Sequence, residues 1–199
     1  MLYSKTVFIL APHPDDAEIA CGGTIARLVE HNAAVYFLVF GKDDTRKAEL
    51  RASLKFMGIK KAFCFDVPIR EFLRFRQQIL DKMVLMKRQL KPDLVIMPSL
   101  DDIHQDHQVI AKEGLRAFKD INLLGYEASW NNMNFEAQMF IRIDNTHLET
   151  KIRAMGFYKS QSDKPYMAPE YVRSLARVRG VQAGFRYAEM FNVVRQVVR

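Results

Sequence analysis

Long hydrophobic runs are missing from this sequence of 199 residues. A membrane-spanning helix needs roughly 20 consecutive apolar residues, and the first apolar stretch, TVFILA at 6–11, is only as long as a strand. The start of the chain also lacks the basic region, longer apolar stretch and small-residue cleavage site of a signal peptide. We therefore expect a cytoplasmic protein without a membrane span.

Cysteine is almost absent as well. Cys21 and Cys64 are the only two, too few for a disulfide framework, and their spacing matches no common zinc-finger pattern. We expect both to be reduced and packed.

Blocks of like charge are also lacking, although the formal net charge is +7. That charge suits either a nucleic-acid surface or a site for an anionic substrate. The basic residues are scattered, and they show no interleaving with aromatic residues of the kind found in RNA-binding sheets. We therefore expect a small-molecule substrate rather than nucleic acid.

Strand-like and helix-like segments alternate along the chain. Short apolar runs predict strands at 6–11, 34–40, 62–67, 92–98, 121–127, 137–143 and 187–194. Apolar residues at helical spacing predict helices at 19–31, 46–57, 73–90, 106–119, 146–158 and 168–179. This alternation predicts an α/β fold, with helices on both faces of a mostly parallel, twisted sheet. A chain of this length suits a single domain over residues 1–199.

Groups that bind metals are concentrated in two loops that follow predicted strands. The first is HPDD at 13–16, and the second is DDIHQDH at 101–107. Three of the five histidines of the chain lie in these two windows: His13, His104 and His107. In parallel α/β sheets, ligands bind beyond the carboxyl ends of the strands, where both loops are expected to lie.

These residue types suit a catalytic metal site. A catalytic zinc ion takes three protein ligands and keeps one position open for water, and imidazole and carboxylate groups are suitable ligands. The water still needs a base, and the oxyanion that forms needs a donor. Asp15, next to Asp16, can act as the base, and His104 can act as the donor. Asp106 could hold His104 in one tautomer and favour its protonated form.

Each loop also has a simpler explanation. HPDD could be a turn in which an aspartate caps the following helix. DIHQDH could be a solvated helix start, with Asp106 placed favourably in the first turn. The occurrence of both after separate strands of one sheet favours a shared site.

Four blocks of the sequence carry a family resemblance: HPDDAEIACGGTIA at 13–26, DIHQDH at 102–107, KIRAMGFYKSQ at 151–161 and RGVQAGFRYAEMF at 179–191. With these blocks the chain resembles the LmbE-like, or PIG-L, superfamily of zinc-dependent N-deacetylases. The resemblance implies a Rossmann-like fold and a zinc ion, or another divalent transition metal, held by His13, Asp16 and His107. It also implies Asp15 as the general base and His104 as the group that stabilises charge near the oxyanion.

The reaction implied by the resemblance is removal of an N-acetyl group from an amino-sugar derivative, which releases acetate and a free amine. The substrate would be an N-acetylglucosamine compound, such as a nucleotide-, lipid- or thiol-linked glycoside. One alternative is hydrolysis of another small amide, such as an N-formyl group. Another is a basic nucleic-acid-binding module with a structural metal. Because small relatives of this kind often assemble, we expect a homo-oligomer.

Substrate contacts are less well defined by the sequence. Arg46 lies after the second predicted strand, and Trp130 and Asn131 follow the strand at 121–127, where an aromatic ring and an amide donor suit a sugar. The simpler explanations are an exposed ion pair between Arg46 and Glu49 and a core or interface position for Trp130. The glycine pair at 22–23 predicts close approach of the backbone to a substrate or to a neighbouring loop.

Overall fold

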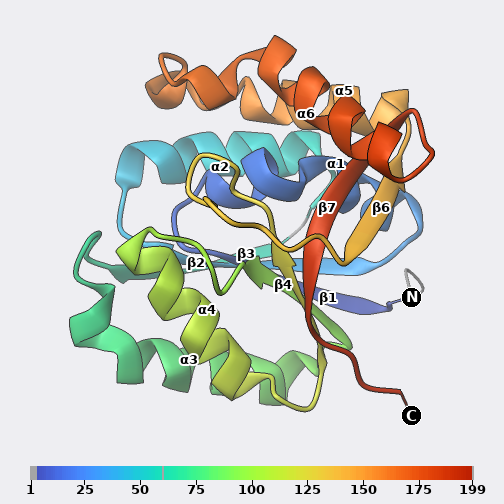
Figure 1. Cartoon of the computed structure of the whole chain (residues 1–199). Helices are drawn as coiled ribbons and strands as arrows, with labels where there is room; N and C mark the ends of the chain where they lie inside the picture. The colour runs from blue at the N-terminus through green and yellow to red at the C-terminus, as the bar shows by residue number, and fades with distance from the viewer. Residues whose placement is uncertain (1–3, 60, 199) are drawn as a thin grey trace.

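A seven-stranded sheet forms the centre of the computed structural model of this chain, which describes residues 4–59 and 61–198 (Figure 1). The strands are β1 (Thr6–Ala11), β2 (Ala34–Gly41), β3 (Lys61–Val67), β4 (Leu94–Pro98), β5 (Asn122–Tyr126), β6 (Met139–Ile143) and β7 (Tyr187–Arg195). Their order is β3-β2-β1-β4-β5-β7-β6. The strands from β3 to β5 pair in parallel, whereas β7 runs antiparallel to both of its neighbours. The predicted α/β fold with a mostly parallel sheet is confirmed.

Helices cover both faces of this sheet (Figure 1). On one side of the sheet lie α1 (Asp16–Glu30) and α2 (Asp44–Phe56), with α5 (Asn145–Met155) and α6 (Pro169–Gln182) stacked outside them. On the opposite side lie α3 (Arg76–Leu90) and α4 (Gln105–Ala117). Three short 3-10 segments complete the connections: η1 (Phe72–Phe75), η2 (Lys159–Gln161) and η3 (Pro165–Met167). Within the described residues, no helix is both long and apolar enough to cross a membrane.

The alternation of side chains along β1 explains why both faces are covered. Val7 and Ile9 belong to the apolar cluster beneath α1 and α2, whereas Phe8 and Leu10 belong to the cluster beneath α3 and α4. All four side chains are fully buried. A strand with two buried faces needs apolar residues at consecutive positions, which is the pattern of TVFILA.

The strand order reverses between β1 and β4, and this reversal positions the site. β2 and β3 lie on one side of β1, while β4 and β5 lie on the other. The helices that follow β1 and β4 then cover opposite faces of the sheet (Figure 1). The two loops therefore diverge and leave a crevice at the carboxyl ends of the strands. They are the HPDD loop at 13–16 and the DDIHQDH loop at 101–107.

Two helix starts differ from the sequence prediction by three residues. α1 begins at Asp16 instead of residue 19, because the carbonyl of Asp15 already accepts the amide of Ile19 at 3.2 Å. The expected helix at 73–90 begins as the 3-10 segment η1 and becomes α-helical only at Arg76. α1 is also interrupted at Cys21, where φ is −136° and ψ is 29°.

A buried ion pair supports this interruption of α1. The carboxylate of Glu189 in β7 accepts the backbone amides of Gly23 at 3.1 Å and Thr24 at 2.6 Å. The ammonium group of Lys151 in α5 lies 2.7 Å from Glu189 and donates to the carbonyl of Ala20 at 3.1 Å. Side chains from distant segments therefore satisfy backbone groups that a continuous helix would have paired.

The glycine pair at 22–23 makes room for these same segments. A Cβ atom added to Gly22 would lie 2.9 Å from Cγ of Lys151, and one added to Gly23 would lie 2.7 Å from Cδ1 of Ile143. A larger residue at either position would therefore force neighbouring side chains to shift, because α5 and β6 approach closely. The sequence predicts that the backbone at these glycines approaches a substrate or a neighbouring loop. In the structure it approaches packed secondary-structure elements instead.

Candidate active site and metal centre

The loop after β1 is folded into a tight turn by its own polar groups. The amide of His13 donates to Oδ2 of Asp16 at 2.7 Å, and the amide of Asp16 donates to the carbonyl of His13 at 3.4 Å. Pro14, which fixes φ and has no N–H, offers its carbonyl to the hydroxyl of Tyr158 at 2.7 Å. This turn brings Nδ1 of His13 to 3.1 Å from Oδ2 of Asp16.

The loop after β4 is organised by the fully buried Asp102. Its Oδ1 accepts the amide of His104 at 2.8 Å, and its Oδ2 lies 2.7 Å from Nδ1 of His107. His104 caps the N-terminus of α4, because its ring Nδ1 accepts the amide of Asp106 at 3.1 Å. The loop therefore fixes the orientation of both of its histidines.

Three buried side chains from the two loops converge on one point. Nε2 of His107 lies 3.2 Å from Oδ2 of Asp16, the same oxygen that lies near His13. One ligand atom from each of His13, Asp16 and His107 lies within 4.8 Å of the others. The two imidazoles and one carboxylate form a donor set that suits a divalent transition metal and leaves room for a further ligand.

The partners of the remaining ring nitrogens support the fit to a metal. Nε2 of His13 lies 3.0 Å from Oδ2 of Asp106, and Nδ1 of His107 lies 2.7 Å from Oδ2 of Asp102. Metal-binding histidines in proteins typically place their second ring nitrogen against a carboxylate in this way, which fixes the tautomer and the direction of the ring.

The charges at this centre raise the pKa values of both imidazoles. Burial alone would lower the pKa of His13, but the charge of Asp16 and hydrogen bonds to Asp106 and Asp16 raise it to about 9. Burial would also lower the pKa of His107, but Asp16 and Asp102 raise it to about 10. Burial would raise the pKa of Asp16, yet the two imidazoles hold it well below its usual range. Protons and a metal ion therefore compete for these side chains.

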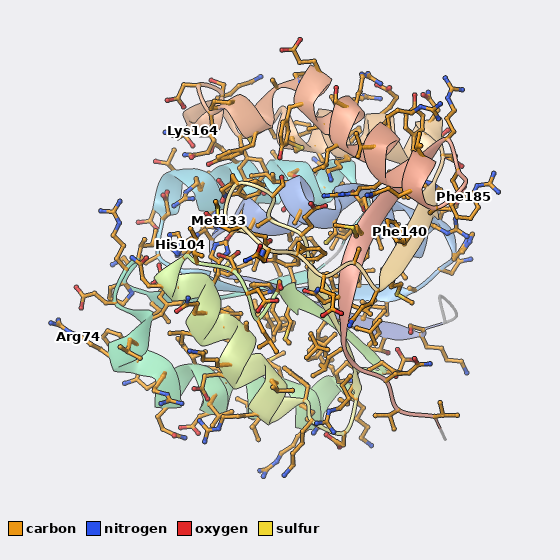
Figure 2. All side chains as sticks on the ribbon, in the orientation of Figure 1. Arg74, His104, Met133, Phe140, Lys164 and Phe185 are labelled. Atoms are coloured by element: carbon orange, nitrogen blue, oxygen red, sulfur yellow. The ribbon has the colours of Figure 1, made fainter. Side chains whose placement is uncertain are left out.

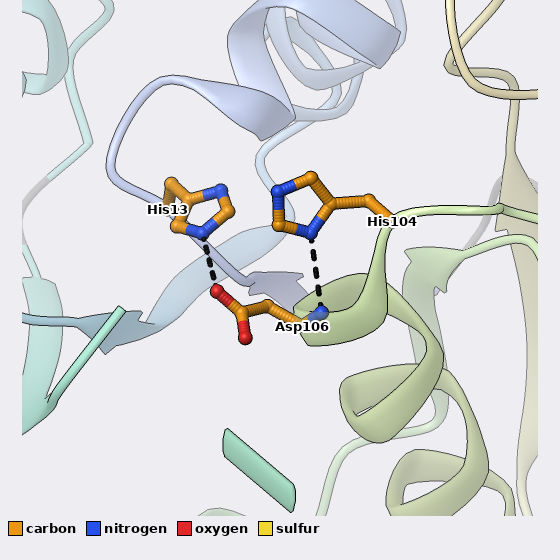
Figure 3. Close-up of side chains that lie close together, drawn as sticks. All are labelled: His13, His104 and Asp106. Carbon is orange, nitrogen blue, oxygen red and sulfur yellow. Dashed lines mark hydrogen bonds and ion pairs between the residues drawn. The ribbon is translucent and has the colours of Figure 1, made fainter. Parts of the chain in front are cut away.

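Asp106 does not hold His104 through its carboxylate, which corrects the sequence expectation. Figure 3 shows the carboxylate directed at His13, while the backbone amide of the same residue donates to His104. A ring nitrogen that accepts an amide carries no proton, so His104 is neutral with its proton on Nε2. Burial and the neighbouring His107 and His13 lower the pKa of His104. The expected protonated form is therefore not favoured.

Asp15 lies beside this centre and is held by Arg46 of α2. Nη1 of Arg46 lies 3.1 and 3.3 Å from the two carboxylate oxygens of Asp15, and its Nε donates to Asp43 at 2.8 Å. Burial and the charge of Asp16 raise the pKa of Asp15, although the guanidinium opposes them. The alternative of an exposed ion pair between Arg46 and Glu49 is wrong, because Glu49 bonds to a backbone amide and hydroxyl in η2.

A polar pocket of about 190 Å³ opens over the centre, and His104 is one of the residues that line it. Figure 2 shows His104 at the start of α4. All three expected substrate contacts, Arg46, Trp130 and Asn131, line it. Trp130 is half-buried, and its ring stacks on Tyr166 with centroids 4.4 Å apart. The pocket therefore has a polar floor and a partly aromatic wall.

Sequence reasoning did not single out five residues of this site: Asp102, Ile19, Ile69, Arg70 and Tyr166. Asp102 had a local signal, because it stands in the acidic histidine loop, five residues before His107. Arg70 has a φ of 69°, and its amide donates to Oδ2 of Asp106 at 2.8 Å. Neither it nor Tyr166 lies in a recognisable pattern of the sequence.

The fold and the site together define an α/β protein with a candidate divalent-metal centre at the carboxyl ends of its parallel strands. The chain belongs to the PIG-L family, because the sequence model of that family, described as GlcNAc-PI de-N-acetylase, matches residues 8–118. This membership places the chain among the deacetylases.

Individual relatives cover nearly the whole chain. The diacetylchitobiose deacetylase of Thermococcus kodakarensis is 26% identical over 224 residues, which cover 96% of this chain and 83% of the relative. The structure of N,N'-diacetylchitobiose deacetylase from Pyrococcus horikoshii has a TM-score of 0.78 at 21% identity, covering 95% of this chain and 83% of that one. GalB, the 4-carboxy-2-hydroxymuconate hydratase of Pseudomonas putida, has a TM-score of 0.83 at 18% identity, covering 98% of each chain. Since a hydratase shares the fold, the chemistry must be argued from the site.

Proposed function

We propose that this protein is a zinc-dependent hydrolase that removes the N-acetyl group from an amino-sugar derivative, releasing acetate and a free amine. The observation that carries the proposal is the convergence of His13, Asp16 and His107 beside Asp15, with all four residues lining one pocket. Membership of a de-N-acetylase family and similarity to a diacetylchitobiose deacetylase support the choice of reaction and substrate.

His13, Asp16 and His107 are the residues proposed to hold the metal. When bound, a zinc ion would supply Lewis acidity toward the acetyl carbonyl and toward water at the position left open by three protein ligands. Asp102 and Asp106 would keep the two imidazoles in the correct tautomer and orientation, since each carboxylate meets the second nitrogen of one ring.

Asp15 is proposed as the general base. It takes a proton from the attacking water and returns it to the leaving nitrogen, so a single carboxylate serves both halves of the hydrolysis. Arg46 keeps that carboxylate in place through contacts of 3.1 and 3.3 Å. Because the guanidinium also lines the pocket, Arg46 remains a candidate for substrate contact beside Trp130 and Asn131.

His104 is proposed to stabilise the oxyanion as a neutral donor. Its Nδ1 is occupied by the amide of Asp106, so Nε2–H is the group that can donate a hydrogen bond into the pocket that the ring lines. A donor fixed by the backbone loses no free energy to reorientation as charge develops on the substrate oxygen. Asp106 then contributes to the reaction through its amide and through His13.

The test is a measurement of acetate release from N-acetylglucosamine compounds in free, nucleotide-linked and lipid-linked form. We expect release from at least one of them, abolished by a chelator and restored by zinc or by another divalent transition metal. Formate release from N-formyl analogues alone would favour the other amide hydrolysis. Salt-sensitive nucleic-acid binding without any release would overturn the proposal in favour of a binding module.

A further inference from the structure

The aromatic part of the pocket wall comes from a different part of the chain than the polar floor. The metal-binding and acid–base candidates all lie within residues 8–118, the segment that matches the family. Trp130 and Asn131 follow β5, and Tyr166 lies in η3 between α5 and α6. The proposed chemistry is therefore built on one segment, and the aromatic part of the pocket wall on another.

The wall is held rigidly in place. Trp130 and Tyr166 stack with an interplanar angle of 20°, and both pack in an apolar cluster with Ile19 of α1. The hydroxyls of Ser129 and Tyr171 are in contact, which ties the loop after β5 to α6. A wall that is already ordered costs less conformational entropy when a ligand binds.

Tyr166 carries a hydroxyl for which the described residues provide no hydrogen-bond partner. Its ring is half-buried and lines the same pocket as Asp15, Asp16 and Arg46. Burial, together with the negative charges of Asp15 and Asp16, raises the pKa of this phenol, so it stays protonated and able to donate. A residue needed only for stacking would gain nothing from a phenolic hydroxyl in this position.

The size of the pocket limits what this wall can enclose. Pockets for drug-sized ligands measure about 300–1,000 Å³, whereas this one measures about 190 Å³. It therefore suits a single sugar ring with its acetamido group, and any further residue or aglycone would extend outside. An aromatic wall can contact the C–H face of such a ring while a hydroxyl at its edge meets a ring substituent.

We propose that Tyr166 is a specificity-determining residue: its ring, fixed against Trp130, closes the pocket over one N-acetylated pyranose, and its hydroxyl donates a hydrogen bond to a hydroxyl of that sugar. This inference rests on the proposed deacetylase function. It extends that function by assigning a substrate contact to a residue outside the segment that matches the family.

The test compares the full-length protein with Tyr166→Phe, which removes the hydroxyl and keeps the ring. Loss of one neutral hydrogen bond lowers kcat/KM on N-acetylglucosamine by about 2- to 13-fold, while the bound metal and the melting temperature stay unchanged. Tyr36→Phe is the matched control, because Tyr36 lies in β2 outside the pocket.

A set of 3-, 4- and 6-deoxy analogues of N-acetylglucosamine identifies the hydrogen bond. One analogue should be turned over equally by the wild type and by Tyr166→Phe, because the bond is already lost from the substrate side. If Tyr166 has a purely structural role, Tyr166→Phe lowers kcat/KM on every substrate by the same factor, and that result overturns the proposal. Equal activity of both proteins on every compound overturns it as well.

Binding can be followed apart from turnover, since Trp130 is the only tryptophan of the chain. Its fluorescence should change when glucosamine, the amine product, binds to the metal-loaded protein, and Tyr166→Phe should bind it more weakly. If Tyr166→Phe shows the same fluorescence change and the same Kd for glucosamine as the wild type, the role of Tyr166 is overturned, even if acetate release is intact. Absence of acetate release from the wild type would instead overturn the proposed function.

Discussion

Oδ2 of Asp102 lies 2.7 Å from Nδ1 of His107, and both side chains are buried. The other oxygen of the same carboxylate accepts the amide of His104. One side chain therefore orients a candidate metal ligand and shapes the backbone of the loop that carries the proposed oxyanion donor. Asp102 is not itself a proposed metal ligand, so its effect on metal binding acts through His107 and can be measured separately.

Asp102→Asn should weaken metal binding by about 10- to 100-fold, the usual effect of removing a carboxylate behind a histidine ligand. The amide keeps the size of the side chain but loses the charge that favours the correct His107 tautomer. Competition with a chromophoric chelator measures the change. Asp101→Asn is the control, because Asp101 is exposed in the same loop, and equal affinity of the two variants would contradict the prediction.

Metal affinity should rise with pH between about 7 and 9. In the metal-free fold the pKa of His13 is about 9 and that of His107 is about 10, so both rings are protonated at neutral pH. Binding must displace these two protons, which strengthens the apparent affinity by up to about 100-fold per pH unit. Metal titrations across this range, with released protons measured in weakly buffered solution, provide the check. Affinity independent of pH would show that the rings do not bind the metal.

The parts of this site that follow directly after a strand could be predicted from the sequence. His13 and Asp16 lie in a short loop behind a continuous apolar run, and His107 follows an equally clear strand. The sheet order then brings the two loops together at the reversal between β1 and β4. Local pattern and a general rule of α/β topology are enough for this much.

The remaining parts depend on side-chain directions and distant segments. Whether Asp106 meets His104 or His13 depends on which groups of the first turn of α4 face the crevice, and sequence spacing does not decide that. Arg70 reaches Asp106 from 36 residues away, through its backbone amide. Tyr166 enters the wall only because α6 packs beside the loop after β5. Contacts of this kind leave no periodic signal in the chain.

Asp15→Asn should keep the metal and lose most of the turnover. Asn has nearly the same shape but cannot accept the proton of the attacking water, and general base catalysis contributes about 10²- to 10⁴-fold in rate. Elemental analysis and acetate release on the same preparation separate the two properties. Activity at the wild-type level would remove Asp15 from the mechanism, and loss of the metal would move Asp15 into the ligand set.

The two variants Arg70→Gly and Arg70→Pro should differ sharply in metal binding. Arg70 has a φ of 69°, a left-handed conformation that glycine adopts freely. Glycine keeps the amide that donates to Asp106, so metal affinity should stay near that of the wild type. Proline has no N–H and fixes φ near −65°. The carboxylate of Asp106 then loses this hydrogen bond and no longer holds His13 in place, so metal affinity should fall. Similar affinities for the two variants would mean that the amide contact does not matter.

Tyr158→Phe should loosen the turn that carries the proposed metal ligand His13 and the proposed base. The hydroxyl lies 2.7 Å from the carbonyl of Pro14 and 2.6 Å from Oε1 of Glu18, and these groups are buried. Removing a donor from buried acceptors costs about 1–3 kcal/mol, or about 2–12 °C in melting temperature for a chain of this size. Because the lost contact is to the loop itself, metal affinity should fall together with stability. Tyr36→Phe again serves as the control, and a Tyr158→Phe protein that melts lower but binds metal as tightly as the wild type would limit the role of Tyr158 to stability.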